Sequence, residues 1–126
     1  MKFSIDKQEK YSVFTLASDK LNSQNAPLLK SEMILLNAEG IRNIIFDMGM
    51  IKFVDSSGLS SILISNRLCK NANGTFVLTG VNDTVLRLIK ISQLDTILQI
   101  VPTIQEAKDL VLMEELERDL NDESEA

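Results

Sequence analysis

The stretch Phe53-Val54-Asp55-Ser56-Ser57-Gly58-Leu59 is the most informative part of the chain, because it predicts the passage from a strand into a helix. The short apolar segment 51–54 is expected to bring the chain to the edge of a sheet. Asp and Ser are favoured helix N-caps, and Gly58 lies in the first turn of a helix expected at 59–70. Backbone N–H groups at a helix start lack intrahelical acceptors, and the helix dipole favours an anion there. The stretch therefore predicts either a plain helix cap or a site for a negatively charged group.

Strand and helix patterns alternate on both sides of this stretch. Segments rich in β-branched and aromatic residues predict strands at 2–7, 11–17, 41–48, 75–79 and 96–101, with a hairpin turn at Glu9-Lys10. Helical spacing predicts helices at 26–38, 59–70, 82–91 and from Ile104 to about Leu120. Asn25 is a candidate N-cap, and Gly40 a candidate stop, for the first of these helices. The order predicts an α/β fold: a mixed β-sheet of about five strands covered by about four helices.

Length and composition indicate one domain and exclude several kinds of active site. With 126 residues and 44% hydrophobic residues, the chain predicts a single domain at 1–120 and an acidic, disordered tail at 121–126. One cysteine and no histidine exclude a disulfide framework, and they argue against zinc hydrolases and His-based triads. Cys69 is interpreted as a small buried hydrophobe. No metal, cofactor or enzymatic activity is expected, since no His is present to activate Ser56.

The net charge of −5 is unevenly distributed. Residues 114–126 hold seven acidic side chains and one basic one, and the rest of the chain is close to neutral. Nothing resembles the basic face that nucleic-acid binding requires, so nucleic acid is not an expected partner. No run approaches about 18 apolar residues, so direct membrane insertion is not expected and the cytoplasm is the expected location. The acidic run is interpreted as a solvated face that could also deter association with other acidic surfaces.

The string 54–59, followed by Ile62-Leu63, resembles the signature of STAS domains, specifically the bacterial anti-sigma factor antagonists (anti-anti-sigma factors). The resemblance covers roughly residues 3–112. Further matching segments are Leu21-Asn22, Val85-Leu86-Arg87-Leu88 and Ile91-Ser92-Gln93-Leu94. Two positions depart from the family pattern. Asn22 stands where Asp is frequent, which removes a carboxylate near the signature, and Gln93 stands where Gly is common.

The resemblance implies a STAS fold and a phosphorylation cycle. In this family the first Ser after the Asp, here Ser56, is phosphorylated by an anti-sigma factor that is also a Ser kinase; Ser57 is the second candidate. The unphosphorylated protein binds the kinase and frees a sigma factor, and a metal-dependent Ser/Thr phosphatase resets the modified protein. Gly58 is expected to let a phosphate or a partner approach the backbone. A monomer is expected, with a partner-binding surface made by Asn22, Asp55, Ser56, Ser57, Gly58, Ser60, Ser61, Ile64 and Leu68.

The helix after Gly58 has two apolar sides. A helical wheel places Leu59, Ile62, Leu63 and Cys69 toward the sheet and Ile64 and Leu68 roughly opposite. The latter pair either packs under a neighbouring helix or forms an exposed patch beside Ser56. An alternative function is that of a non-phosphorylated accessory subunit of a lipid or anion transporter, docking through the same helix end. A small Ser hydrolase is the weakest interpretation.

Overall fold

The computed structural model describes residues 2–125, with side chains described for residues 2–122. A five-stranded mixed sheet has the order β1 (Phe3–Lys7), β2 (Ser12–Leu16), β4 (Ile44–Asp47), β6 (Phe76–Thr79) and β7 (Gln99–Val101). β1 runs antiparallel to β2, and the remaining neighbours pair in parallel. A second, two-stranded parallel sheet joins β3 (Lys20–Leu21) to β5 (Phe53–Val54). The predicted mixed sheet is confirmed.

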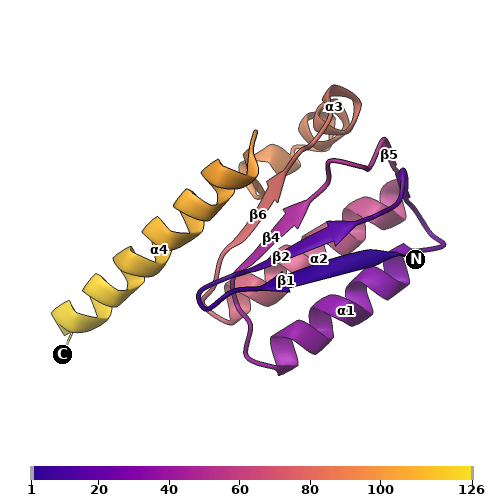
Figure 1. Ribbon diagram of the computed structural model, residues 1–126. Helices are drawn as coiled ribbons and strands as arrows, with labels where there is room; N and C mark the ends of the chain where they lie inside the picture. The colour runs from indigo at the N-terminus through magenta and orange to yellow at the C-terminus, as the bar shows by residue number, and fades with distance from the viewer. Residues whose placement is uncertain (1, 126) are drawn as a thin grey trace.

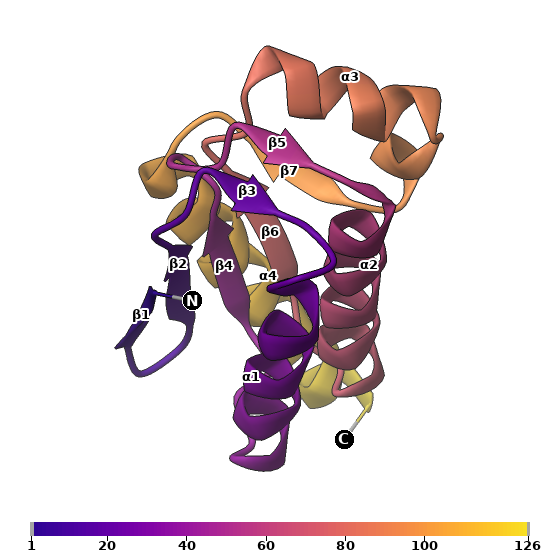
Figure 2. The ribbon, with the colours of Figure 1, turned by 90° about the vertical axis from the view of Figure 1, so that its right-hand side faces the viewer.

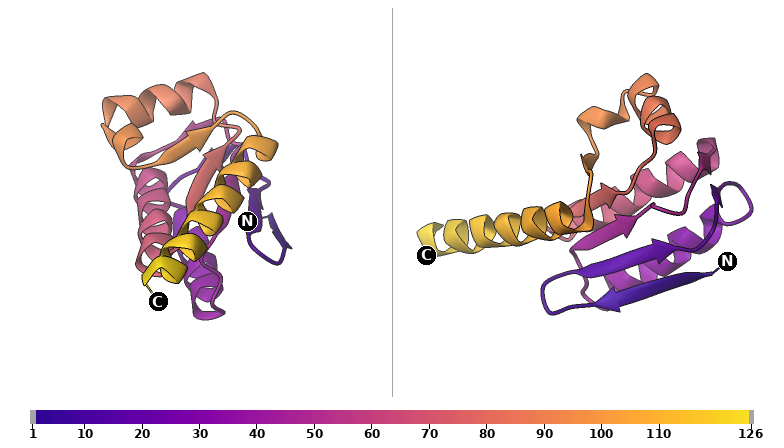
Figure 3. Two further views of the ribbon diagram at one scale, coloured as in Figure 1. Left: turned by 90° about the vertical axis from the view of Figure 1, so that its left-hand side faces the viewer. Right: turned by 45° about the horizontal axis from the view of Figure 1, so that its top comes forward.

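Helices cover both faces of the main sheet. They are α1 (Ala26–Ala38), α2 (Ser56–Asn71), α3 (Asp83–Ile91), a 3₁₀ turn η1 (Leu94–Thr96) and α4 (Ile104–Glu125). α1 and α2 lie side by side on one face, and α4 alone crosses the other (Figures 1 and 2). Figure 3 shows the same division from the side of α4. Over residues 2–125, the α/β fold with four α-helices agrees with the expectation.

The core forms one layer on each face of the sheet. Phe14, Phe46 and Phe76 come from neighbouring strands and pack ring to ring in the layer that also contains the buried residues of α1 and α2. Val13, Ile45 and Val77 point the other way and meet Ala107 and Val111 of α4. Because β4 is covered on both faces, its first three residues, Ile44-Ile45-Phe46, form an apolar run without alternation.

Several local expectations need correction. The Asn25 side chain does not cap α1; its Oδ1 accepts from the Asn22 N–H, and its Nδ2 donates to the Lys20 carbonyl. α2 begins at Ser56, earlier than expected, because Asp55 is its cap. Gln93 has φ +61, so it occupies a left-handed position where the family's glycine would be unstrained. Gly40 does follow the end of α1 with φ +88, as predicted.

The acidic C-terminal run is not simply a solvated tail. α4 continues to Glu125 instead of ending near Leu120, and Ala126 lies outside the described residues. The disorder expected at 121–126 stays a prediction. Two acids of the run, Glu114 and Glu115, pack against the end of the sheet where β4 and β6 begin. Glu115 accepts from Arg42 at 3.1 and 3.0 Å and from Arg118 at 3.2 Å.

These contacts belong to a polar cluster that fastens α4 to the sheet. Its members are Arg42, Asn43, Thr75, Gln99, Glu114, Glu115 and Arg118. Burial alone would raise the pKa of Glu115. Hydrogen bonds from Asn43, Arg42 and Arg118 together outweigh burial, so the pKa of Glu115 is lowered to about 2. The pKa of Glu114 is also lowered, since hydrogen bonds from Gln99 and Thr75 exceed the opposing effect of burial. Both carboxylates are therefore structural anions.

Candidate functional site

The carboxylate of Asp55 joins two parts of the chain at the start of α2. Its Oδ1 accepts from the Gly58 N–H at 2.8 Å, which is the side-chain cap of the helix. Its Oδ2 accepts from the Ser23 N–H at 3.2 Å, in the loop that follows β3. The cap interpretation is therefore confirmed. The same side chain also brings the loop after β3 against the helix start.

Ser56 and Ser57 are the first two residues of α2. The Ser56 side chain is exposed, and Ser57 is half-buried. Among the described residues, neither hydroxyl makes a side-chain hydrogen bond, and neither backbone N–H has an acceptor. The Ser56 hydroxyl is thus accessible to another protein, next to two free amides.

The loop 22–25 lies beside the two serines because β3 and β5 pair. Leu21 and Val54 are partners in this short sheet, and the Asp55 N–H donates to the Leu21 carbonyl at 3.2 Å. Asn22 is half-buried, and its Oδ1 accepts from the Gln24 N–H at 3.0 Å. A shallow depression of about 400 Å³ lies at this loop and is lined by Ser18, Asp19, Lys20, Asn22, Gln24, Asn25 and Leu28. Figure 2 shows β3 and β5 at the end of the molecule where α1 and α2 both begin.

Gly58 has a packing role, which corrects the expectation that it lets a partner approach. The residue is buried, and a Cβ built on it would lie 2.3 Å from the Leu21 carbonyl oxygen and 2.8 Å from Val54 Cγ1. Glycine is required because β3 passes directly over the first turn of α2. The surface that Gly58 would offer is already occupied by this chain.

The remaining predicted residues of α2 divide into two groups. Ser60 is exposed, as a partner-binding residue must be. Ser61 is fully buried and donates its hydroxyl to the Gly58 carbonyl at 2.6 Å, so the expectation that it contacts a partner is wrong. Ile64 is half-buried, and Leu68 is half-buried and packs against the core. This pair does not form the freely exposed apolar patch that was one of the two alternatives.

Sequence reasoning missed an exposed aromatic ring beside the site. Phe53 has 58% of its surface exposed and precedes Asp55 by two residues, whereas its neighbour Val54 packs against the core. The period-2 alternation of a strand is the signal that could have found it, since an inward Val54 places Phe53 outward. Cys69 is buried, and burial raises the pKa of its thiol to about 12, in agreement with its interpretation as a hydrophobe.

Comparison with known proteins decides the family. A model of the STAS domain matches residues 2–107. The chain belongs to the STAS domain family. Within residues 2–125, no helix of this STAS domain combines the length and the apolarity that crossing a membrane requires.

Relatives of this STAS domain carry the name of anti-sigma factor antagonist. One from Thermotoga neapolitana is 31% identical over 97 residues, which cover 75% of this chain and 85% of the relative. The crystal structure of one from Thermotoga maritima is 28% identical and has a TM-score of 0.78, covering 86% of this chain and 93% of its own. The antagonist SpoIIAA of Bacillus has been solved in unphosphorylated and phosphorylated forms. Both forms share the fold, with a TM-score of 0.69 each, and both comparisons cover 87% of this chain. The unphosphorylated form is 19% identical and is covered over 97% of its length, and the phosphorylated form is 21% identical and is covered over 99%. This chain is a STAS domain of the anti-sigma factor antagonist family.

Proposed function

We propose that this protein is a phosphorylation-controlled antagonist. The unphosphorylated protein binds an anti-sigma factor with Ser kinase activity and thereby frees a sigma factor. Phosphorylation of Ser56 ends the binding, and a metal-dependent Ser/Thr phosphatase restores it. The observation that carries the proposal is the exposed Ser56 hydroxyl, directly after the capping Asp55 at the start of α2.

The modification adds charge without displacing any bond within the domain. Ser56 Oγ attacks the γ-phosphorus of ATP held by the kinase, the bond to ADP breaks, and a base of the kinase takes the hydroxyl proton. The phosphoryl group brings about −1.5 to −2 charge and strong acceptor oxygens. The Gly58 N–H stays bound to Asp55, while the amides of Ser56 and Ser57 are free to meet the new anion. The fold should therefore persist while the surface becomes strongly negative.

The partner surface is expected to surround Ser56. Ser57 and Ser60 flank it on α2, and the loop containing Asn22 lies beside it through the Asp55 bridge. Phe53 adds an exposed aromatic side chain, the type that often anchors protein interfaces. A partner seated over this surface would place its own groups next to Ser56. Like-charge repulsion from Asp55 and the phosphate would then act on any acidic group of that partner.

The experiment is phosphate transfer with the cognate anti-sigma factor kinase and Mg-ATP, followed by mapping of the modified residue by mass spectrometry. One phosphate on Ser56 is expected, and none on a Ser56→Ala variant. A Ser57→Ala variant is the matched control and should accept phosphate like the unchanged protein. Phosphate on Ser57 alone would contradict the assignment of Ser56. No transfer to either residue would contradict the cycle and favour the transporter accessory alternative.

A further inference from the structure

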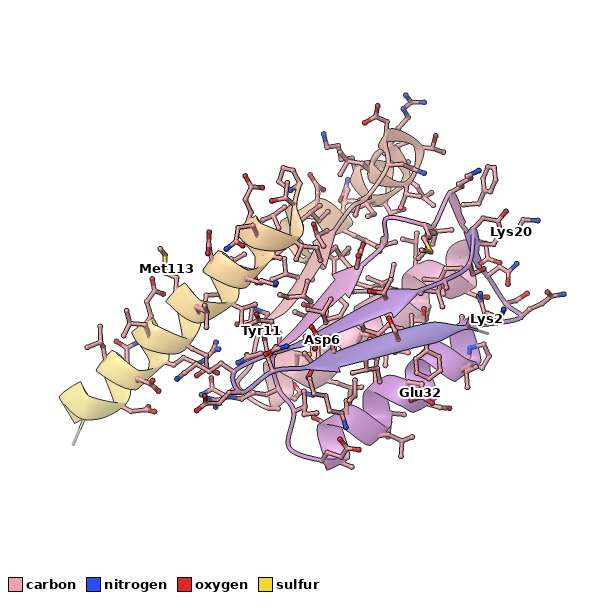
Figure 4. All side chains as sticks on the ribbon, in the orientation of Figure 1. Lys2, Asp6, Tyr11, Lys20, Glu32 and Met113 are labelled. Atoms are coloured by element: carbon pink, nitrogen blue, oxygen red, sulfur yellow. The ribbon has the colours of Figure 1, made fainter. Side chains whose placement is uncertain are left out.

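Helix α4 has an apolar stripe that faces away from the domain. Its inner side packs Ala107 and Val111 against the sheet. On its outer side, Leu112 is 42% exposed, Met113 60% and Leu116 58%. Figure 4 shows Met113 pointing away from the sheet. An ordinary surface helix carries polar residues on its outer face, so this arrangement requires an explanation.

The exposed side chains form one continuous surface. At about 100° per residue, Leu112, Met113 and Leu116 fall within roughly 100° of the helix circumference, on the side opposite Val111. We call these three residues the α4 stripe; Leu120, one turn further along, is also 53% exposed. The C-terminal half of α4 extends past the end of the sheet (Figures 1 and 3). The stripe is therefore accessible to a partner lying along the helix.

The edges of the α4 stripe are acidic. Asp119 borders it on one side and Glu117 on the other, and Asp109 lies one turn before Met113; all three are exposed. Two basic residues of α4 lie near: Lys108, half-buried one turn before Leu112, and Arg118, which points inward to Thr75 and Asn43 in the polar cluster. Around the stripe, exposed acids outnumber bases by three to one, because Asp109, Glu117 and Asp119 face Lys108 alone.

We propose that the α4 stripe docks an amphipathic helix of a partner protein whose apolar face is flanked by Lys or Arg. Charge complementarity selects this occupant. A second copy of α4 would place the acidic edges of one helix against those of the other. An anionic membrane surface would repel the same carboxylates. The proposal is independent of Ser56, since α4 and α2 cover opposite faces of the sheet, and both surfaces can be occupied together (Figure 3).

The test uses a fluorescent peptide of about five helical turns, with Leu on one face and Lys elsewhere, measured by anisotropy. A scrambled peptide of the same composition and a version with Glu in place of Lys are the peptide controls. The Leu/Lys helix should bind the unchanged protein, and Leu116→Asn should weaken binding by about tenfold or more. Leu35→Asn, at a position on α1 that is 57% exposed, is the matched control and should leave binding unchanged.

Several outcomes would overturn the proposal. The proposal fails if the scrambled or the Glu peptide binds as tightly as the Leu/Lys helix, or if the Leu/Lys helix does not bind. It also fails if Leu116→Asn leaves the affinity for the Leu/Lys helix unchanged. Sedimentation velocity and binding to phosphatidylglycerol vesicles test the other occupants. If the protein forms a dimer or binds the vesicles, and Leu116→Asn abolishes this, the occupant of the α4 stripe is a second copy or a membrane and the proposal is wrong. Circular dichroism checks that the variant remains folded. If Leu116→Asn unfolds the protein, Met113→Gln must give the same loss of peptide binding, or the proposal fails.

Discussion

Single residues at the start of α2 show how packing can override a local preference. In a helix interior Ala is favoured over Gly by about 1 kcal/mol. At Gly58, however, a Cβ would overlap the Leu21 carbonyl oxygen at 2.3 Å. For Gly58→Ala, helix propensity predicts a gain in the free energy of unfolding and the overlap predicts a loss. We expect the loss, because the overlapping atom belongs to the backbone and cannot move aside easily.

Gly58→Ala is expected to lower the free energy of unfolding by about 1–3 kcal/mol, the usual cost of overpacking. Ser60→Ala, at an exposed position of the same helix, is the control and should raise stability by a few tenths of a kcal/mol through helix propensity. Urea denaturation of both variants gives the comparison. A stabilised Gly58→Ala protein would show that β3 does not pass over this turn.

Asp55 is expected to matter for stability as well as for signalling. Asp55→Ala removes the acceptors of the Gly58 and Ser23 N–H groups and should cost about 1–2 kcal/mol, the range for losing an N-cap. Asp55→Asn keeps one acceptor oxygen, so its free energy of unfolding should lie between those of the unchanged protein and Asp55→Ala. Thermal and urea unfolding would measure this order. Equal stabilities of all three proteins would mean that the cap contributes nothing in solution.

The sequence is sufficient to predict the roles of some residues at the start of α2 but not of others. The cap at Asp55 could be predicted because it depends on the next three residues alone. The crowding at Gly58 could not, because it depends on β3, a two-residue strand brought over the helix from elsewhere in the chain. Short strands of this kind carry too little periodicity to be read from sequence.

Among the elements, helix ends with local signals were predictable. The bounds of α1 follow from its helical spacing and Gly40, and α3 begins after Asn82, whose side chain accepts from the Val85 N–H. The end of α4 was not predictable from its acidic composition. Glu115 is held by Arg42, and Glu114 by Thr75 and Gln99, all from other elements of the fold, so the charge run is part of a packed cluster.

This cluster should make stability depend on pH. The pKa of Glu115 is about 2 in the fold against an ordinary 4.5, so the folded state binds fewer protons than the unfolded state between these values. Its contribution is present above pH 4.5 and is lost as pH falls toward 2. Glu115→Gln should lower the free energy of unfolding by about 1.5–3 kcal/mol at neutral pH, the range for hydrogen bonds to a charged group.

The stability difference between the unchanged protein and Glu115→Gln should shrink through this pH window, as measured by urea denaturation at a series of pH values. Glu117→Gln, an exposed change on the same helix, is the control and should have little effect at any pH. A difference that stays constant down to pH 2 would show that the carboxylate is not held ionised by its neighbours.

At the scale of the whole molecule, the sheet separates two surfaces. The α2 end carries Ser56 and Phe53, and the opposite face carries the α4 stripe. The succession of strands and helices along the chain was predictable because strand and helix patterns alternate after the first hairpin. The outward α4 stripe was not singled out, since leucines on a helix are ordinarily assigned to a core.

The most direct measurement compares the affinity of unphosphorylated and Ser56-phosphorylated protein for the cognate anti-sigma factor by isothermal titration calorimetry. We expect the phosphate to weaken binding by about a hundredfold or more, as close like charges do, with an unchanged circular dichroism spectrum. Ser56→Asp should weaken binding in the same direction, and Ser31→Asp, an exposed change on α1, should not. Undiminished affinity of the phosphorylated protein, or loss of its secondary structure, would contradict the view that Ser56 controls docking through charge.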